Sequence, residues 1–152
     1  MTSETHTDLT GTNPLRRGIA KTTCLVMGVL FLIVAVWGFI DGDNVLIFHV
    51  NAAHNMVHLL SGIAALACAF AGEQVARIFC WTFGLTYGLV ALLGFAGVTV
   101  VEDLLHLNPA DDWLHVGITL VFLLAAALST RNAPARAGIP RIKRAEHRPS
   151  LR

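Results

Sequence analysis

The sequence predicts an all-α integral membrane protein, an up-down bundle of four transmembrane helices built from two repeated helical hairpins. Hydrophobic residues make up 55% of the 152 residues and charged residues only 14%, whereas soluble domains average about 25% charged residues. The charges are segregated from four uncharged stretches, each long enough for a helix to cross a bilayer, which takes roughly 20 residues. A His- and Asn-rich segment of the first half also returns in the second half.

The four uncharged stretches place the membrane spans at about residues 22–40, 52–72, 77–101 and 113–130. None shows the polar face that a soluble amphipathic helix carries at the helical period. The first stretch is too long for a signal sequence and lacks a cleavage site, so we expect an uncleaved anchor. We expect residues 1–21 and 131–152 to form disordered tails, the second of them basic.

The distribution of Lys and Arg predicts the orientation of the spans. These residues precede the first span, follow the fourth, and occur between spans two and three at Arg77. The other two loops hold acidic residues and no Lys or Arg. The positive-inside rule then places both termini in the cytoplasm and both acidic loops on the outer side of the membrane. Trp37, Trp81 and Trp113 fall near span ends, as interfacial residues do.

Small residues predict close packing between these helices. Gly84 and Gly88 form a GxxxG pair in the third span, and Ser61, Ala65 and Ala69 form a small face in the second. Such faces let helix backbones approach each other in lipid.

Three cysteines, Cys24, Cys68 and Cys80, lie near the cytoplasmic ends of their spans. We expect buried apolar thiols and no disulfide, because the cytoplasm is reducing. The alternative is a thiol metal site.

An internal repeat relates the two halves of the chain. Residues 49–58 match residues 106–115 at a constant offset of 57 positions, with a His at both ends of each segment. Gly38-Phe39 returns as Gly94-Phe95 with a slip of one position. Two hairpins of one design imply a pseudo-twofold axis along the membrane normal.

The segment from Val50 to Gly62, followed by the segment from Asn108 to His115, resembles a bacterial family of four-helix membrane proteins catalogued as a domain of unknown function. The similarity covers about residues 22–130. Its motif is an Asn or Asp three residues before a His at the opening of spans two and four, and His54 is not part of it. The resemblance implies the fold and the topology, and it brings no activity.

The repeat also predicts a polar cluster below the outer ends of spans two and four. His58 lies about six residues into its span, roughly 9 Å deep, and His115 lies near the start of span four. His54 shares a helix face with His58, and Asp111 shares one with His115. The remaining polar residues of the cluster are predicted to be structural: His49, Asn51, Asn55, His106, Asn108 and Asp112.

Three interpretations of this cluster are open. In the first, either the two Asn of the repeat or the Asn55 and Asp112 pair cap the helix starts, and the histidines bond between helices. In the second, His54, His58, Asp111 and His115 bind a transition metal. In the third, His58 and His115 hold a haem or a pigment axially.

The sequence contains no phosphate loop, nucleophile elbow or Ser-His-Asp pattern, and we predict no catalytic residues. We therefore expect a non-catalytic structural or accessory component embedded in the lipid bilayer, as a subunit of a larger membrane complex. No nucleic-acid partner is expected, since no recognition element accompanies the basic residues. The alternative function is a metal- or haem-binding redox protein that uses the histidine cluster.

Overall fold

The computed structural model describes residues 18–42 and 44–129. Its helices are α1 (Ile19–Asp41), α2 (Ala52–Ala71), α3 (Glu73–Phe95), α4 (Thr99–Leu105) and α5 (Pro109–Leu128), and its strands are β1 (Asn44–Val45) and β2 (Phe48–His49). Helices α1, α2, α3 and α5 are long and apolar enough to cross a membrane. The prediction of an all-α, multi-pass membrane bundle is confirmed. The predicted tails lie almost entirely outside the described residues, although α1 already includes residues 19–21.

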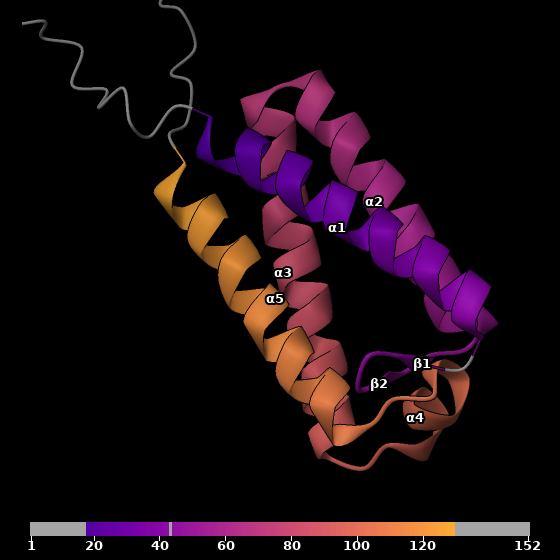
Figure 1. Cartoon of the computed structure of the whole chain (residues 1–152). Coiled ribbons are helices and arrows are strands. Elements are labelled where there is room, and N and C mark those ends of the chain that lie inside the picture. Colours follow the sequence, from indigo (N-terminus) through magenta and orange to yellow (C-terminus); the bar gives the residue numbers. More distant parts are fainter. Residues whose placement is uncertain (1–17, 43, 130–152) are drawn as a thin grey trace, which may run out of the picture.

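The long helices form two pairs, α1 against α2 and α3 against α5 (Figure 1). Helices α1 and α3 also contact each other and join the pairs. At one end of the bundle, here called the turn end, α1 begins, Gly72 connects α2 to α3, and α5 ends. At the other end, here called the loop end, lie the β ribbon (β1 and β2) and α4.

Helix α3 begins at Glu73 rather than at about residue 77. Gly72, with a φ of 117°, makes the turn and lets the new helix begin at the next residue. The Glu73 carboxylate accepts hydrogen bonds from the backbone N–H groups of Ala20 (3.1 Å) and Lys21 (3.0 Å). A carboxylate at the first turn of a helix satisfies free N–H groups and complements the helix dipole. Glu73, the charged residue at which the predicted second span ended, therefore connects the two hairpins.

The two helix boundaries on either side of α4 also differ from the prediction. Helix α3 ends at Phe95 rather than at about residue 101, because Gly97 adopts a φ of 64° and the chain then enters α4. Helix α5 begins at Pro109 rather than at about residue 113, because Asn108 caps it and proline is favoured at the first helical position.

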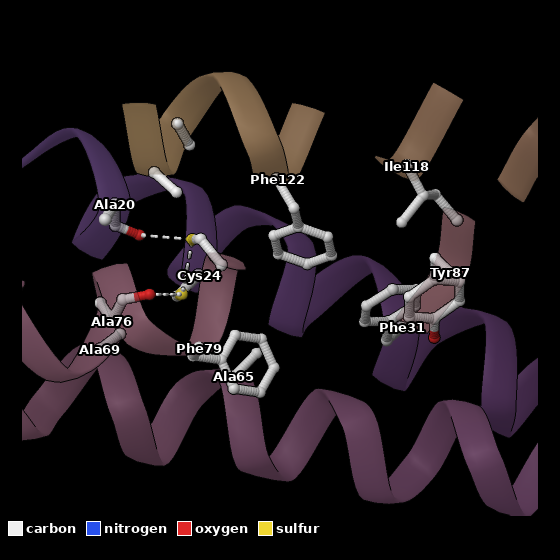
Figure 2. Close-up of a cluster of buried hydrophobic side chains, with 13 residues drawn as sticks. Ala20, Cys24, Phe31, Ala65, Ala69, Ala76, Phe79, Tyr87, Ile118 and Phe122 are labelled. Atoms are coloured by element: carbon white, nitrogen blue, oxygen red, sulfur yellow. Dashed lines mark hydrogen bonds between the residues drawn. The ribbon is translucent and has the colours of Figure 1, made fainter. Parts of the chain in front are cut away.

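Residues 56 positions apart in α1 and α3 face each other in the core (Figure 2). The Cys24 thiol donates to the Ala76 carbonyl (3.6 Å), and the Cys80 thiol donates to the Ala20 carbonyl (3.9 Å). The two Sγ atoms are 3.6 Å apart, and both cysteines are free and buried. Farther along the same interface, the rings of Phe31 and Tyr87 stack with centroids 5.5 Å apart. These contacts are reciprocal, as a twofold arrangement requires.

Glycines set the spacing within each hairpin. A Cβ atom at Gly84 would lie 2.7 Å from the Leu123 side chain, and one at Gly88 would lie 3.2 Å from Thr119. The GxxxG pair therefore packs α3 against α5. In the other hairpin, a Cβ at Gly62 would lie 2.9 Å from the backbone oxygen of Gly28. The helix backbones of α1 and α2 approach each other at this point.

Candidate functional site

The repeated asparagines Asn51 and Asn108 begin α2 and α5. The Asn51 side-chain oxygen accepts a hydrogen bond from the His54 backbone N–H (2.8 Å). The Asn108 oxygen accepts from the N–H groups of Ala110 (2.9 Å) and Asp111 (3.0 Å). Of the two capping arrangements that the sequence left open, the structure has the one in which these asparagines are the caps.

The same two side chains connect the hairpins. The Asn51 amide donates to the Leu104 carbonyl of α4 (2.9 Å), and the Asn108 amide donates to the Ile47 carbonyl of the β ribbon (3.0 Å). Leu104 and Ile47 are themselves 57 positions apart. Each cap therefore holds the loop of the opposite hairpin, which explains why both asparagines recur at one spacing.

Asn55 and Asp112 lie one turn deeper and are buried. A Cβ atom at Gly38 would overlap the Asn55 side chain, and one at Gly94 would overlap that of Asp112. The repeated glycines Gly38 and Gly94 thus lie where these two polar side chains pack against the neighbouring helix. Within the described residues, Asn55 Oδ1 and Asp112 Oδ1 have no hydrogen-bond partner.

His58 and His115 lie at the same depth, each six positions after the first residue of its helix. The expectation that His115 lies near the start of the fourth span was wrong, because the Asn108 cap and Pro109 extend α5 toward the loop end. At 1.5 Å per residue, both histidines lie roughly 9 Å below the helix starts.

Three histidines meet near this depth, with His54 one helical turn closer to the start of α2 than His58. The ring centroids of His54 and His58 are 4.5 Å apart, and those of His54 and His115 are 6.1 Å apart. His58 stacks on Phe31 (5.7 Å), and His115 lies 5.4 Å from the Tyr87 ring. The three imidazoles are only 3%, 5% and 3% exposed. None of their Nδ1 atoms has a hydrogen-bond partner among residues 18–42 and 44–129.

Asp111, the fourth predicted metal ligand, is instead part of the helix cap. Its Oδ2 atom accepts a hydrogen bond from the Asn108 backbone N–H (2.9 Å), which completes a capping box. The structure therefore brings together three of the four residues. In the part of the chain that the structure describes, no three His, Cys, Asp or Glu side chains are arranged to hold a metal ion.

His49 and His106 lie apart from this cluster, on the exposed surface of the loop end. They border a shallow hollow together with Glu102 and Asp103. The His106 backbone has a φ of 52° and ends α4.

Two cavities flank the buried histidines. The first, here called the histidine cavity, has a volume of about 210 Å³, and the three imidazoles, Ser61, Thr86 and Tyr87 line part of it. The second, here called the ribbon cavity, has a volume of about 280 Å³ and lies between α1, the β ribbon and α5. Leu30, Phe31, His58, Asp111 and Ile118 are among its lining residues.

Sequence reasoning missed the three hydroxyl residues of the histidine cavity, Ser61, Thr86 and Tyr87, as site residues. The Tyr87 hydroxyl donates to Ser61 Oγ at 3.5 Å, a long bond. Tyr87 is the only tyrosine of the chain, and it stands where the first hairpin has Phe31. Comparing the repeats in their helical parts would have found it.

No curated protein and no solved structure matches this chain. A family model does match residues 21–128, from the first turn of α1 to the last residue of α5. This range covers more than two thirds of the chain, and it includes both hairpins, both cavities and the histidine cluster. The chain belongs to the family described as domain of unknown function DUF4383.

Proposed function

We propose that this chain is a non-catalytic structural or accessory component of the bacterial inner membrane, assembled from two hairpins of one design. The observation that carries the proposal is that the repeated polar residues have structural roles in the bundle. Asn51 and Asn108 cap helices and bind the opposite loops, and Asp111 completes a cap. Asn55 and Asp112 fill the helix crossings. The repeated polar residues therefore support a role in building a rigid bundle.

The outer surface of the bundle supports an accessory role within the membrane. Large apolar side chains are exposed on all four long helices, for example Ile40 (80%), Phe70 (78%), Leu85 (62%) and Leu124 (57%). Such a surface fits lipid and the helices of other membrane proteins, and we propose both as its surroundings.

The described charges support the orientation proposed for the bundle. Lys21 and Arg77 lie at the turn end, whereas Asp41, Glu102 and Asp103 lie at the loop end. By the positive-inside rule, the turn end and both termini face the cytoplasm.

The accessory role is tested in native membranes. A photo-crosslinking residue at Leu85, which is exposed, is compared with one at Phe122, which is buried. We expect one reproducible product of defined mass from position 85, matching a complex seen on native electrophoresis, and none from position 122. Migration as a single chain in mild detergent, without any product at exposed positions of the four helices, would refute the role.

A metal- or haem-binding redox function is the second candidate, and the three buried imidazoles favour it. Two of the three ring separations are short, at 4.5 and 6.1 Å, although no three side chains of the described residues are arranged to hold a metal ion. A metal would need a fourth ligand other than Asp111. A haem between His58 and His115 fits less well, because the His54 ring packs beside His58. The histidine cavity is also smaller than the roughly 300–1,000 Å³ of ordinary ligand pockets.

Elemental analysis tests this second candidate. The protein is purified from native membranes without chelators, beside the His58→Ala/His115→Ala double variant. A metal near one equivalent in the native chain and lost in the variant supports it. Equal metal content in both, or none in either, rules these ligands out.

A further inference from the structure

We propose that the histidine cavity binds a small neutral phenol, a single aromatic ring with a hydroxyl group, taken up from the surrounding lipid. This inference goes beyond the accessory role and does not depend on it.

The two cavities of the bundle supply the first argument, because they occupy matching places in the two hairpins. Positions of α1 and α3 match at an offset of 56, and positions of α2 and α5 match at an offset of 57. Matching lining positions hold different residues, with the ribbon cavity given first: Leu30 and Thr86, Phe31 and Tyr87, Ile118 and Ser61, Asp111 and His54. In three of these pairs an apolar side chain is replaced by a hydroxyl. The Thr86 hydroxyl donates to the Thr82 carbonyl of its own helix (2.9 Å). The ribbon cavity shows that the fold is built without the other two hydroxyls, so packing does not explain those of Ser61 and Tyr87.

The hydrogen-bonding state of the cavity wall supplies the second argument. His54, His58 and His115 each have a buried Nδ1 atom that lacks a partner within the described residues. A neutral imidazole has one nitrogen that donates and one that accepts. Leaving such groups unpaired in a buried site costs free energy. The Nδ1 atoms are enclosed rather than open to the cavity, so the imidazole rings must turn toward a hydroxyl-bearing ligand for that cost to be recovered. The long Tyr87–Ser61 bond leaves those hydroxyls free to turn toward the same ligand.

Volume and charge define the ligand class. A cavity of about 150 Å³ accommodates benzene, so about 210 Å³ accommodates one ring with one or two small substituents. Phe83, Tyr87 and the imidazoles offer flat surfaces to such a ring. Among the described residues, no Asp, Glu, Lys or Arg lines this cavity, so an ionised ligand would have no partner charge there.

The rim of the cavity faces the bilayer. Val57 is 41% exposed and Thr86 is exposed, and both project from the lateral surface of the long helices. A neutral phenol dissolves in the interfacial region of a membrane, and it reaches this rim without crossing water.

The test uses 4-fluorophenol and fluorine NMR with the full chain in lipid nanodiscs, and protein-free nanodiscs serve as the background. The test variant, Ser61→Ile/Tyr87→Phe, gives the histidine cavity the residues of the ribbon cavity. The matched control, Phe31→Tyr/Ile118→Ser, makes the reciprocal change in the ribbon cavity. We expect saturable binding to the native chain and to the control, and binding about tenfold weaker to the test variant, the loss from one good hydrogen bond.

A second probe separates hydrogen bonding from simple apolar binding. Fluorobenzene has the same ring without the hydroxyl, and we expect it to bind the native chain about tenfold more weakly than 4-fluorophenol. Equal affinity for the two probes, unchanged affinity in the test variant, or the absence of saturable binding would each overturn the proposal. Circular dichroism checks that the variants fold. If the double variant does not fold, Tyr87→Phe alone, which removes one oxygen atom, gives the same comparison.

Discussion

Substituting Gly62 by alanine tests how closely α1 and α2 approach each other. The added Cβ atom would lie 2.9 Å from the Gly28 backbone oxygen and 2.9 Å from the Leu32 side chain. Leu32 can rotate, but a backbone oxygen cannot, so the helices must separate. Overpacking of this kind costs about 1–3 kcal/mol.

Gly117→Ala is the matched control. Gly62 and Gly117 both lie inside helices of 20 residues, and a Cβ atom at Gly117 would meet nothing within 4 Å. Both substitutions gain about 0.8–1.0 kcal/mol from the higher helix propensity of alanine, and this gain cancels in the comparison. The free energy of unfolding of Gly62→Ala should therefore fall about 1–3 kcal/mol below that of Gly117→Ala.

Unfolding in mixed micelles with increasing sodium dodecyl sulfate, followed by far-ultraviolet circular dichroism, measures the difference. Gly88→Ala should lower the free energy of unfolding by an intermediate amount. Its Cβ atom would lie 3.2 Å from the Thr119 side chain, which can move more easily than a backbone oxygen. Equal stability of Gly62→Ala and Gly117→Ala would refute the close backbone crossing.

Three further predictions concern the Asn108 cap, the cysteine pair and the orientation of the chain. Asn108→Ala removes a helix cap and a bond to the opposite loop, so the free energy of unfolding should fall by about 2 kcal/mol; a loss below about 0.5 kcal/mol would contradict that double role. A membrane-permeant oxidant should cross-link Cys24 to Cys80, whose Sγ atoms are 3.6 Å apart, and leave the Cys68 thiol free. Thiol counting by mass spectrometry checks this, Cys80→Ser should block it, and a bond to Cys68 would disprove the contact. A fluorescent reporter that folds only in the cytoplasm should be bright when fused to the C-terminus; a dark fusion at normal protein levels would reverse the proposed orientation.

Apolar run length predicted the four long helices, because a membrane-spanning helix must satisfy its own backbone and must be apolar along its length. Local sequence could not give the helix ends so well. Charge set the predicted start of the third span at about residue 77, but α3 begins at Glu73, whose carboxylate accepts hydrogen bonds from the start of α1. A contact between residues 53 positions apart leaves no local signal. The β ribbon and α4 are too short to produce one.

The polar site was predicted in composition and only partly in arrangement. The repeat indicated equivalent positions for His58 and His115, and both lie six positions after the first residue of their helices. The repeat could not predict which of two matching polar residues, Asp111 or His54, joins the buried histidine cluster. Asp111 and His54 occupy matching positions, yet Asp111 bonds to its own helix cap while His54 joins the other imidazoles. A carboxylate at this position can accept the backbone N–H bond that completes a capping box.

The reciprocal contacts between α1 and α3 have one more consequence. Two identical hairpins on separate chains could make the same contacts around an exact twofold axis, as isologous dimers do. Exact symmetry would then force both lateral cavities to have the same lining. Joining the hairpins through Gly72 removes that constraint, so one copy can keep Phe31 and Ile118 while the other carries Tyr87 and Ser61. The two halves of a single chain can thus differ in function, because one cavity can keep an apolar lining while the other acquires polar side chains.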